Sequence, residues 1–258
     1  TAPYIIKAWV MLVQRMVASG HFLFRWRSYV LFAFVPLLYW AVTQGESIEN
    51  NWGDIPGESA EVLAILMVIA GEAVRIGTVG YVPRGTSGRN ASQGQLATRL
   101  NTTGFYSVVR NPLYFGNCLM YLGLALYTQN LWVTTIMALA LALYYERIIA
   151  AEESFLTPKF GKVYTDWAAK TPAFFPRLSG WENPDMPFSL RTVIRREHAS
   201  MFGGFLGVYL VELGLHSLPA NAEPIDNWWH VALIVAVVLE LSAIVIKRYT
   251  NLLDVDGR

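Results

Sequence analysis

Long apolar runs are the feature that most constrains what this chain can fold into. A helix needs about 20 predominantly apolar residues to cross a bilayer, and it satisfies its own backbone hydrogen bonds there. The chain is 54% hydrophobic with a mean hydropathy of +0.35, which is a membrane composition. We therefore predict an all-α, polytopic membrane helix bundle that forms a single domain over residues 1–258. Six membrane-spanning helices are expected, at residues 28–43, 62–82, 112–127, 131–146, 199–217 and 228–246.

The N-terminal segment has a different pattern. Residues 4–18 carry Lys7, Gln14 and Arg15 near one helical face and apolar residues near the other. These charges interrupt the segment too early for it to span the bilayer, so we expect a helix that lies in the membrane interface. Pro36 lies inside the first expected span and predicts a kink, because neighbouring helices satisfy the freed carbonyl.

Charged residues are distributed unevenly along the chain. The connections expected at residues 44–61 and 218–227 contain no Lys or Arg and carry Asp and Glu instead. By the positive-inside rule, both termini and both polar segments are expected in the cytoplasm. Net charge is only +1 and no run of like charges occurs, so we expect no nucleic-acid partner.

Cysteine and histidine contents exclude two further classes of site. Cys118 is the single cysteine, so an intrachain disulfide and a cysteine metal cluster are excluded. The four histidines, His21, His198, His216 and His230, show no close pairing of the zinc-site kind. No metal site is expected.

Two ionisable residues, Glu72 and Arg75, lie inside the second expected span. Such groups are costly at membrane depth unless they are paired or face a polar cavity, and their i,i+3 spacing places both on one helical face. A local ion pair and a substrate-binding role both remain open. The polar loop that follows, residues 83–111, is expected to form the rim of a cofactor site.

The last two expected spans form a helix pair over residues 198–249. Gly203 and Gly207 lie four residues apart, which suits close helix packing. Glu212 and Glu240 also lie inside these spans, and their partners are not identified by the sequence.

A polar loop meets an apolar helix at Arg110-Asn111-Pro112. Asparagine suits a helix N-cap, and proline suits the first helical position, where its missing N–H costs nothing. A helix is expected to begin here, and its N-terminal N–H groups and dipole favour an anionic group beside the Arg110 guanidinium. A capped membrane helix with an interfacial arginine is the simpler interpretation.

Several short motifs together resemble the isoprenylcysteine carboxyl methyltransferase family of integral-membrane enzymes. The resemblance runs over residues 101–177, with a weaker echo at 72–80, and leaves the pair 198–249 outside the pattern. Asparagine stands at 111, where the family often has histidine, and this also resembles phospholipid-methylating relatives. The motifs are Thr103-Gly104-Phe105-Tyr106, Arg110-Asn111-Pro112-Leu113-Tyr114-Phe115-Gly116, Gly123, Arg147-Ile148, Glu152-Glu153 with Leu156, and Phe160-Gly161 with Tyr164.

The resemblance implies a catalytic core at 101–177 that uses S-adenosylmethionine as cofactor. The run Asn-Thr-Thr-Gly-x-Tyr-Ser at 101–107 looks like bacterial lipid phosphate methyltransferases, which act for example on lipid A. We therefore expect methyl transfer to an anionic group of a membrane lipid, by a protein of a bacterial inner membrane with its active site on the cytoplasmic side. A phosphate or carboxylate oxygen is already nucleophilic at neutral pH, so the protein positions the oxygen and excludes water.

Methyl transfer of this kind leads us to expect roles for particular residues. Arg147 and Arg110 are expected to position the anion, because a guanidinium grips two oxygens at once. Glu72 and Arg75 are the candidate substrate-binding residues. The expected cofactor-binding residues are Tyr106, Asn111, Pro112, Tyr114, Glu152 and Glu153.

Other functions remain open at this stage. One is methyl esterification of a prenylcysteine-type carboxylate, and another is phospholipid N-methylation. Membrane sterol reductases, which use NADPH, are similar to this family in their C-terminal helices and loop. A non-catalytic membrane scaffold is a further alternative, although ionisable residues at membrane depth argue against it. The sequence contains no Gly-x-Gly-x-x-Gly motif and so does not indicate a soluble-type methyltransferase domain; the oligomeric state is not determined.

Overall fold

The structure is a computed structural model that describes residues 2–27, 29–83, 85–86, 97–219 and 223–258. All regular elements in these ranges are helices, which confirms the predicted all-α class. The elements are α1 (Ala2–Arg25), the 3₁₀ helix η1 (Val30–Phe34), α2 (Val35–Thr43), α3 (Ser47–Trp52), α4 (Asp54–Tyr81), α5 (Phe105–Val108), α6 (Pro112–Tyr127), α7 (Leu131–Phe160), α8 (Lys162–Lys170), the 3₁₀ helix η2 (Leu178–Gly180), α9 (Leu190–Leu215) and α10 (Asn227–Tyr249).

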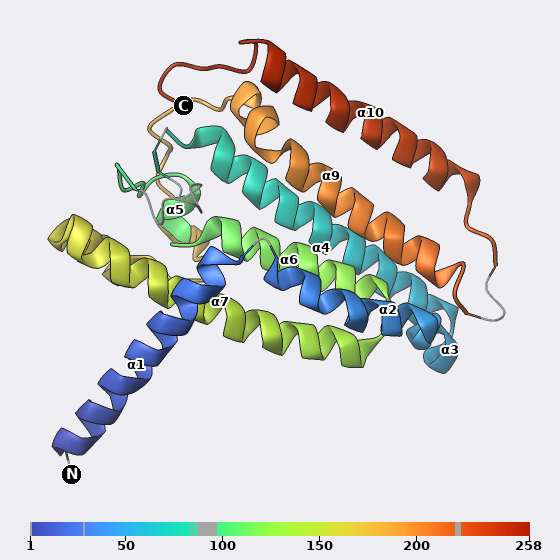
Figure 1. The fold of residues 1–258 in the computed structure, drawn as a ribbon, viewed down its shortest axis with the longest axis horizontal. Coiled ribbons are helices and arrows are strands. Elements are labelled where there is room, and N and C mark those ends of the chain that lie inside the picture. Colours follow the sequence, from blue (N-terminus) through green and yellow to red (C-terminus); the bar gives the residue numbers. More distant parts are fainter. Residues whose placement is uncertain (1, 28, 84, 87–96, 220–222) are drawn as a thin grey trace.

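The long helices pack in a row. α10 packs on α9, α9 on α4, α4 on α6, and α6 on α7 (Figure 1). The short helix α2 contacts both α9 and α7, and α8 follows α7 at the end where α5 also lies. Elements far apart in the sequence are thus neighbours, and α9 lies directly against the α4–α6 pair.

Four of the described helices, α4, α7, α9 and α10, are long and apolar enough to cross a membrane. They indicate an integral membrane protein, but the six expected spans are not all confirmed. α6 has 16 residues, which at 1.5 Å per residue is only about 24 Å long. The apolar segment at residues 32–43 is shorter still.

The segment expected as a kinked first span, residues 28–43, contains two short helices of different type. η1 ends at Phe34 and α2 begins at Val35, so Pro36 lies in the first turn of α2. A proline there loses no intrahelical hydrogen bond, because the first N–H groups of a helix have no intrahelical partner. Pro36 therefore helps to start a helix instead of kinking one, so the predicted kink is wrong, and the membrane crossing of this segment remains a prediction.

α7 is longer than the span expected at 131–146. It continues without interruption to Phe160 and so includes the polar residues Glu152 and Glu153. The turn before it was predicted correctly: α6 ends at Tyr127, and the Asn130 side chain accepts a hydrogen bond from the Val133 N–H at 3.1 Å. One rigid helix therefore carries both the apolar segment and the candidate site residues.

α1 extends to Arg25 and projects away from the row of helices, with its C-terminal part against α7 (Figure 1). The two helices meet at Gly20, where an added Cβ would collide with the Arg147 carbonyl. The placement of α1 in the membrane interface remains a prediction.

A close helix contact joins α4 to α6 through glycines. An ideal Cβ on Gly116 would lie 2.7 Å from the Gly71 carbonyl oxygen and 2.8 Å from Arg75 Cγ, and one on Gly123 would lie 2.6 Å from the Ala64 carbonyl oxygen. Of the two glycines expected to mediate close packing in α9, Gly207 lies against α6, with its added Cβ 3.3 Å from Leu124 Cδ2, whereas Gly203 has nothing within 4 Å of its added Cβ.

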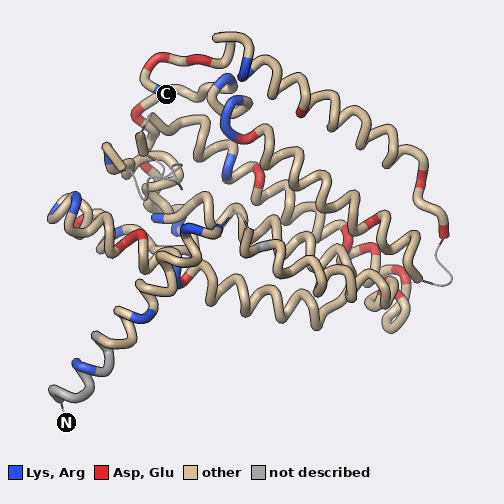
Figure 2. Tube along the Cα trace, in the orientation of Figure 1, with Lys and Arg blue, Asp and Glu red and all other residues tan. Residues whose placement is uncertain are grey.

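The two ends of the bundle differ in charge. Lys and Arg lie toward the end that carries α5 and the C-terminal half of α7, whereas α3 and the start of α10 carry acidic residues (Figure 2). At the acidic end the Tyr127 hydroxyl donates to Glu212 at 2.8 Å, and Gln129 donates to Glu61 at 2.8 Å. This asymmetry agrees with the predicted orientation, which remains a prediction.

Replacement of Gly116 by alanine should destabilise the bundle, because the new methyl group overlaps the α4 backbone. Overpacking of this kind costs about 1–3 kcal/mol. We expect a lower melting temperature for Gly116→Ala in neutral detergent. Gly203→Ala is the matched control and should melt like the wild type; equal melting of all three proteins would contradict the close α4–α6 contact.

Candidate functional site

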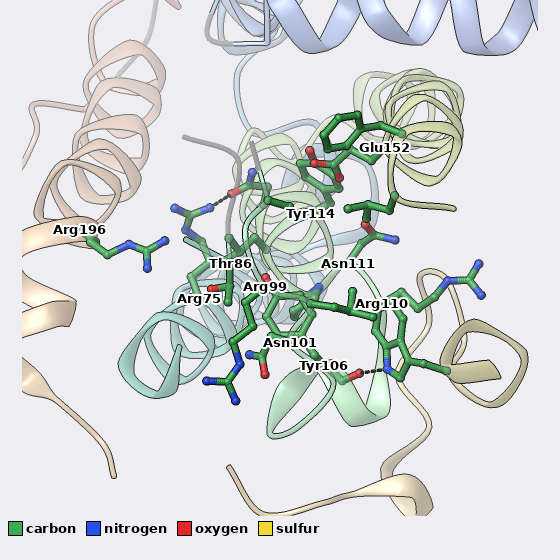
Figure 3. A pocket seen from close by; sticks show the side chains of 18 of the residues that line it. Arg75, Thr86, Arg99, Asn101, Tyr106, Arg110, Asn111, Tyr114, Glu152 and Arg196 are labelled. Atoms are coloured by element: carbon green, nitrogen blue, oxygen red, sulfur yellow. Dashed lines mark hydrogen bonds between the residues drawn. The ribbon is translucent and has the colours of Figure 1, made fainter. Parts of the chain in front are cut away.

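A cavity of about 280 Å³ lies where α4, α6, α7 and α9 meet the polar loop before α5. Most of the residues that line it are polar or charged, and they include several arginines (Figure 3). Part of the loop predicted to form the rim of a cofactor site lines the cavity, namely Thr86 and residues 97 and 99–101, while residues 84 and 87–96 of the same loop lie outside the described part. Its role toward a cofactor stays a prediction. The lining residues are Arg27, Arg75, Thr86, Ala97, Arg99, Leu100, Asn101, Tyr106, Arg110, Asn111, Pro112, Leu113, Tyr114, Asn117, Glu152, Phe155, Leu156, Trp167, Arg196 and Glu197.

α6 begins at the cavity, as predicted from Arg110-Asn111-Pro112. Asn111 is the N-cap residue and Pro112 the first helical residue, but the Asn111 side chain does not cap the helix. Its amide donates instead to the Ala173 carbonyl at 2.9 Å. The capping role is therefore wrong, because the segment after α8 supplies an acceptor that competes with the local cap.

The Arg110 guanidinium is held by the protein itself. Its Nη1 donates to the carbonyls of Ala168 and Thr171, at 2.7 and 3.2 Å, and its Nη2 pairs with Glu153 at 2.6 Å. In Figure 3 the guanidinium points away from the centre of the cavity. Charge-assisted hydrogen bonds are the strong ones, so Arg110 fastens the end of α8 to α7. Glu153 is engaged in this contact and is not among the described residues that line the cavity.

One wall of the cavity combines a carboxylate with aromatic side chains. The Tyr114 hydroxyl hydrogen-bonds the Glu152 carboxylate, and the two side chains lie together in Figure 3. The Trp167 indole N–H donates to the Tyr106 carbonyl at 3.1 Å. Burial, and then the Glu152 charge, raise the pKa of Tyr106 to about 12. The Tyr106 hydroxyl is therefore protonated at neutral pH and remains a donor.

Arg75 enters the cavity from α4 and does not pair with Glu72. Its Nη1 donates to Asn117 Oδ1 of α6, and its Nη2 lies 2.5 Å from Glu197 Oε2 of α9. Glu72 instead accepts a hydrogen bond from Ser200 at 3.0 Å. Of the two possibilities that the sequence left open, the local ion pair is not formed, because α9 brings a carboxylate that the sequence spacing does not reveal. Arg75 lines the cavity, and Glu72 is not among the described lining residues.

A second cavity, of about 470 Å³, adjoins the first and is more aromatic. The two cavities share four lining residues: Arg27, Arg75, Tyr114 and Asn117. The boundary between a polar and an apolar space therefore carries two guanidinium groups. The remaining residues of the second cavity are Phe32, Phe34, Val35, Leu38, Tyr121, Leu124, Met137, Tyr144, Tyr145 and Ser200.

The structure does not bring Arg147 to the other expected site residues. Its Nη1 donates to the Leu143 carbonyl at 3.1 Å and lies 3.3 Å from Glu146 Oε2, and its side chain is 33% exposed. It lies where α1 crosses α7 and is not among the described lining residues of either cavity. Its anion-positioning role remains a prediction without a contact that supports it.

Several lining residues were not singled out from the sequence. Asn117 had a visible signal, because an amide in the middle of an apolar helix needs a partner. Arg196 lies in the N-terminal part of α9, but nothing in the local sequence shows that it lines this cavity. Glu197 is only 2% exposed and pairs with a residue more than a hundred positions away.

Comparison with known proteins separates the first helices of the bundle from the C-terminal helix pair. Residues 60–163 match the family model of phospholipid methyltransferases. The matched segment covers α4, α5, α6 and α7. It begins and ends earlier than the expected core at 101–177 and does not include α9 or α10. The resemblance to integral-membrane methyltransferases is thereby confirmed over this segment.

Three curated proteins illustrate the relationship. The chain is 36% identical to the cobalt-zinc-cadmium resistance protein CzcN of Cupriavidus metallidurans over 156 residues, 60% of this chain and 63% of that protein. It is 44% identical over 86 residues to the nickel-cobalt-cadmium resistance protein NccN of Alcaligenes xylosoxydans xylosoxydans, covering 33% and 40% of the two chains. It is 32% identical over 79 residues to the protein-S-isoprenylcysteine O-methyltransferase of Schizosaccharomyces pombe, covering 31% and 34%.

The matches thus cover less than two thirds of the length of these relatives. No solved structure matches the chain.

Replacing Arg110 with glutamine should loosen the end of α8. A hydrogen bond to a charged group is worth about 1.5–3 kcal/mol, so losing the Glu153 pair alone should raise the rate of local opening roughly tenfold or more. We expect faster limited trypsin cleavage at Lys162 and Lys170. Arg147→Gln, at the contact between α1 and α7, is the control and should be cleaved at the wild-type rate. An unchanged cleavage rate in Arg110→Gln would contradict the proposal that Arg110 holds α8 to α7.

Proposed function

We propose that this chain is an integral-membrane methyltransferase that uses S-adenosylmethionine and methylates an anionic group on a membrane lipid. The observation that carries the proposal is the pair of adjoining cavities, one polar and one apolar, with guanidinium groups at their boundary. Such a boundary suits an acceptor whose charged head enters the polar space while its chain stays in the apolar one. The match of residues 60–163 to phospholipid methyltransferases supports this choice of reaction.

The residues around the polar cavity fit the chemistry of S-adenosylmethionine. Glu152 would accept hydrogen bonds from the cofactor's amino group or ribose hydroxyls, and Tyr114 orients that carboxylate. Tyr106 and Trp167 offer aromatic surface for the adenine, and both line the cavity. The N-terminal N–H groups of α6, at Pro112 and beyond, favour a carboxylate. When bound, the cofactor supplies an electrophilic methyl group.

The acceptor that fits the lining is anionic. Apart from Arg110, whose guanidinium is held by the protein, four arginines line the polar cavity, against two glutamates, and a guanidinium is well suited to phosphate oxygens. A lipid phosphate such as that of lipid A is our first candidate for the acceptor. A prenylcysteine-type carboxylate carries the same charge and is the second. A phospholipid amine is less suited to this lining, because it would place a developing cation among arginines.

The protein's part in the reaction is to bind, orient and shield. Arginines at the boundary hold the anionic oxygen, and the apolar cavity keeps water from the reacting centre. The cytoplasmic orientation belongs to the same proposal, because the Lys- and Arg-rich end of the bundle carries the polar cavity and the soluble cofactor is available there.

Two of the relatives are named for resistance to divalent metals. Within the described residues, no group of three or more His, Cys, Asp or Glu side chains is arranged to hold a metal ion. A metal-binding function is therefore not proposed for this chain. Modification of a membrane lipid is a function that a metal-resistance setting also accommodates.

A direct test is transfer of labelled methyl from S-adenosylmethionine into total membrane lipid by the purified protein, followed by mild base. A methyl phosphodiester, the product of methylating a phosphate monoester, should keep its label, whereas a carboxyl methyl ester should release labelled methanol. Mass spectrometry of the labelled lipid then names the acceptor. Binding of NADPH without S-adenosylmethionine would overturn the proposal in favour of a reductase, and binding of neither would favour a scaffold.

Glu152→Gln should weaken S-adenosylmethionine binding by roughly tenfold or more, because it replaces a carboxyl oxygen, which we propose accepts from the cofactor's amino group or ribose hydroxyls, with an amide nitrogen. Titration of the folded variant measures this dissociation constant. Glu146→Gln on the exposed side of the same helix is the matched control and should bind like the wild type. An unchanged affinity in Glu152→Gln would remove this residue from the cofactor site.

Arg147→Ala tests whether Arg147 positions the anion, as expected from the sequence, although it is not among the described lining residues of either cavity. Because Arg147 lies outside both cavities, we expect its alanine variant to retain methyl transfer. Loss of transfer with intact cofactor binding would instead return Arg147 to the catalytic site.

A further inference from the structure

Arg75 occupies the boundary between the polar and the apolar cavity and lines both. Its side chain is 15% exposed, so most of the guanidinium is removed from solvent. The stem crosses α6 at Gly116, where any Cβ would come within 2.8 Å of Arg75 Cγ. Only a glycine at 116 leaves room for the arginine to reach this boundary.

Three helices fix the position of the guanidinium. Arg75 comes from α4, its Nη1 donates to Asn117 of α6, and its Nη2 is 2.5 Å from Glu197 of α9. A guanidinium carries five N–H donors, so each Nη keeps a second donor after these two contacts. Arg75 is thus oriented by the protein and still able to bind an anion.

Stability alone does not account for this arrangement. A buried ion pair often contributes little, since desolvation offsets the attraction. The Arg75 Nε is also buried and has no hydrogen-bond partner in the described part of the chain, which adds a cost. Ionisable groups kept at membrane depth at such cost usually serve a function.

Glu197 has two effects on Arg75. It holds the guanidinium at the boundary, and its negative charge offsets part of the positive charge there. A fully uncompensated arginine would bind an anionic oxygen tightly and lower its nucleophilicity. A partly compensated arginine would orient the oxygen and leave it reactive.

We infer that Arg75 binds the anionic head of the acceptor at the boundary of the two cavities, and that Glu197 of α9 is the positioning residue that sets how tightly it does so. This inference rests on the proposed function and deepens it. It also extends the site beyond residues 60–163, the segment that matches the phospholipid methyltransferase family, to α9, which lies outside that segment.

The binding test uses dodecyl phosphate as the anionic probe and dodecanol as the neutral probe of equal chain length, with the full chain in neutral detergent. We expect Arg75→Gln to weaken dodecyl phosphate binding by about tenfold or more, and Glu197→Gln to tighten it by about threefold to tenfold. Dodecanol affinity should not change in either variant.

The matched controls replace two charged residues of α9 and α10, Arg195 and Glu240, which are not among the described lining residues of either cavity. Arg195→Gln removes the partner of Asp254, and Glu240→Gln removes the partner of His198. Both should bind dodecyl phosphate like the wild type. A purely structural role for Glu197 predicts a lower melting temperature with unchanged dodecyl phosphate affinity, and that result would overturn the inference.

Glu197→Asp provides a second variant in case Glu197→Gln fails to fold. It keeps the charge but shortens the side chain, so the guanidinium should move and dodecyl phosphate binding should weaken severalfold. Wild-type affinity in Glu197→Asp would contradict the positioning role. In turnover assays, Glu197→Gln should lower both KM for the acceptor and kcat. A loss of folded protein would lower the apparent kcat alone and leave KM unchanged.

A separate titration keeps the two proposals distinguishable. If the wild-type protein binds dodecyl phosphate through Arg75 but binds no S-adenosylmethionine, the anion site stands and methyl transfer fails. If it binds S-adenosylmethionine while Arg75→Gln leaves dodecyl phosphate affinity unchanged, the inference about Arg75 fails and the cofactor assignment stands.

Discussion

Close contact between the backbones of α4 and α6 is the constraint on which the rest of the structure depends. Gly71 and Gly116 face each other so closely that a single methyl group would overlap the opposite helix. Between membrane helices, close packing of small residues replaces the hydrophobic driving force that acts in water. The contact also lets Arg75 pass over α6, so the same glycines that join the helices open the route to the boundary of the cavities.

The candidate site is assembled around this contact from elements far apart in the sequence. α7 brings Glu152 to one wall, and α9 brings Glu197 to the opposite side. Arg110 fastens the end of α8 to α7, which holds Trp167 over the cavity. Arg110 thus holds two helices together, whereas Arg75 lines both cavities, and the two roles are distinguished by the hydrogen-bond partners of each guanidinium.

Polar and apolar spaces meet within a single bundle in this protein. Most membrane bundles bury few ionisable side chains, because each must find a partner or a wet cavity. Here the ionisable groups concentrate at the boundary and at the acidic end, while most of α10 is apolar and exposed along its length. The C-terminal helices therefore combine an exposed apolar surface, on α10, with a contribution to the lining of the polar cavity, from α9.

Sequence alone determined the all-α membrane class, the start of α6 at Pro112, the tight turn before α7 and the inclusion of Tyr106, Tyr114 and Glu152 in one site. These depend on local composition, on proline and turn chemistry, and on short motifs. The tertiary structure decided the partners: Glu197 for Arg75, backbone carbonyls and Glu153 for Arg110, and a position outside the cavity for Arg147. Ion pairs across helices depend on how the helices pack, and that packing follows from glycine contacts that hydropathy and spacing do not encode.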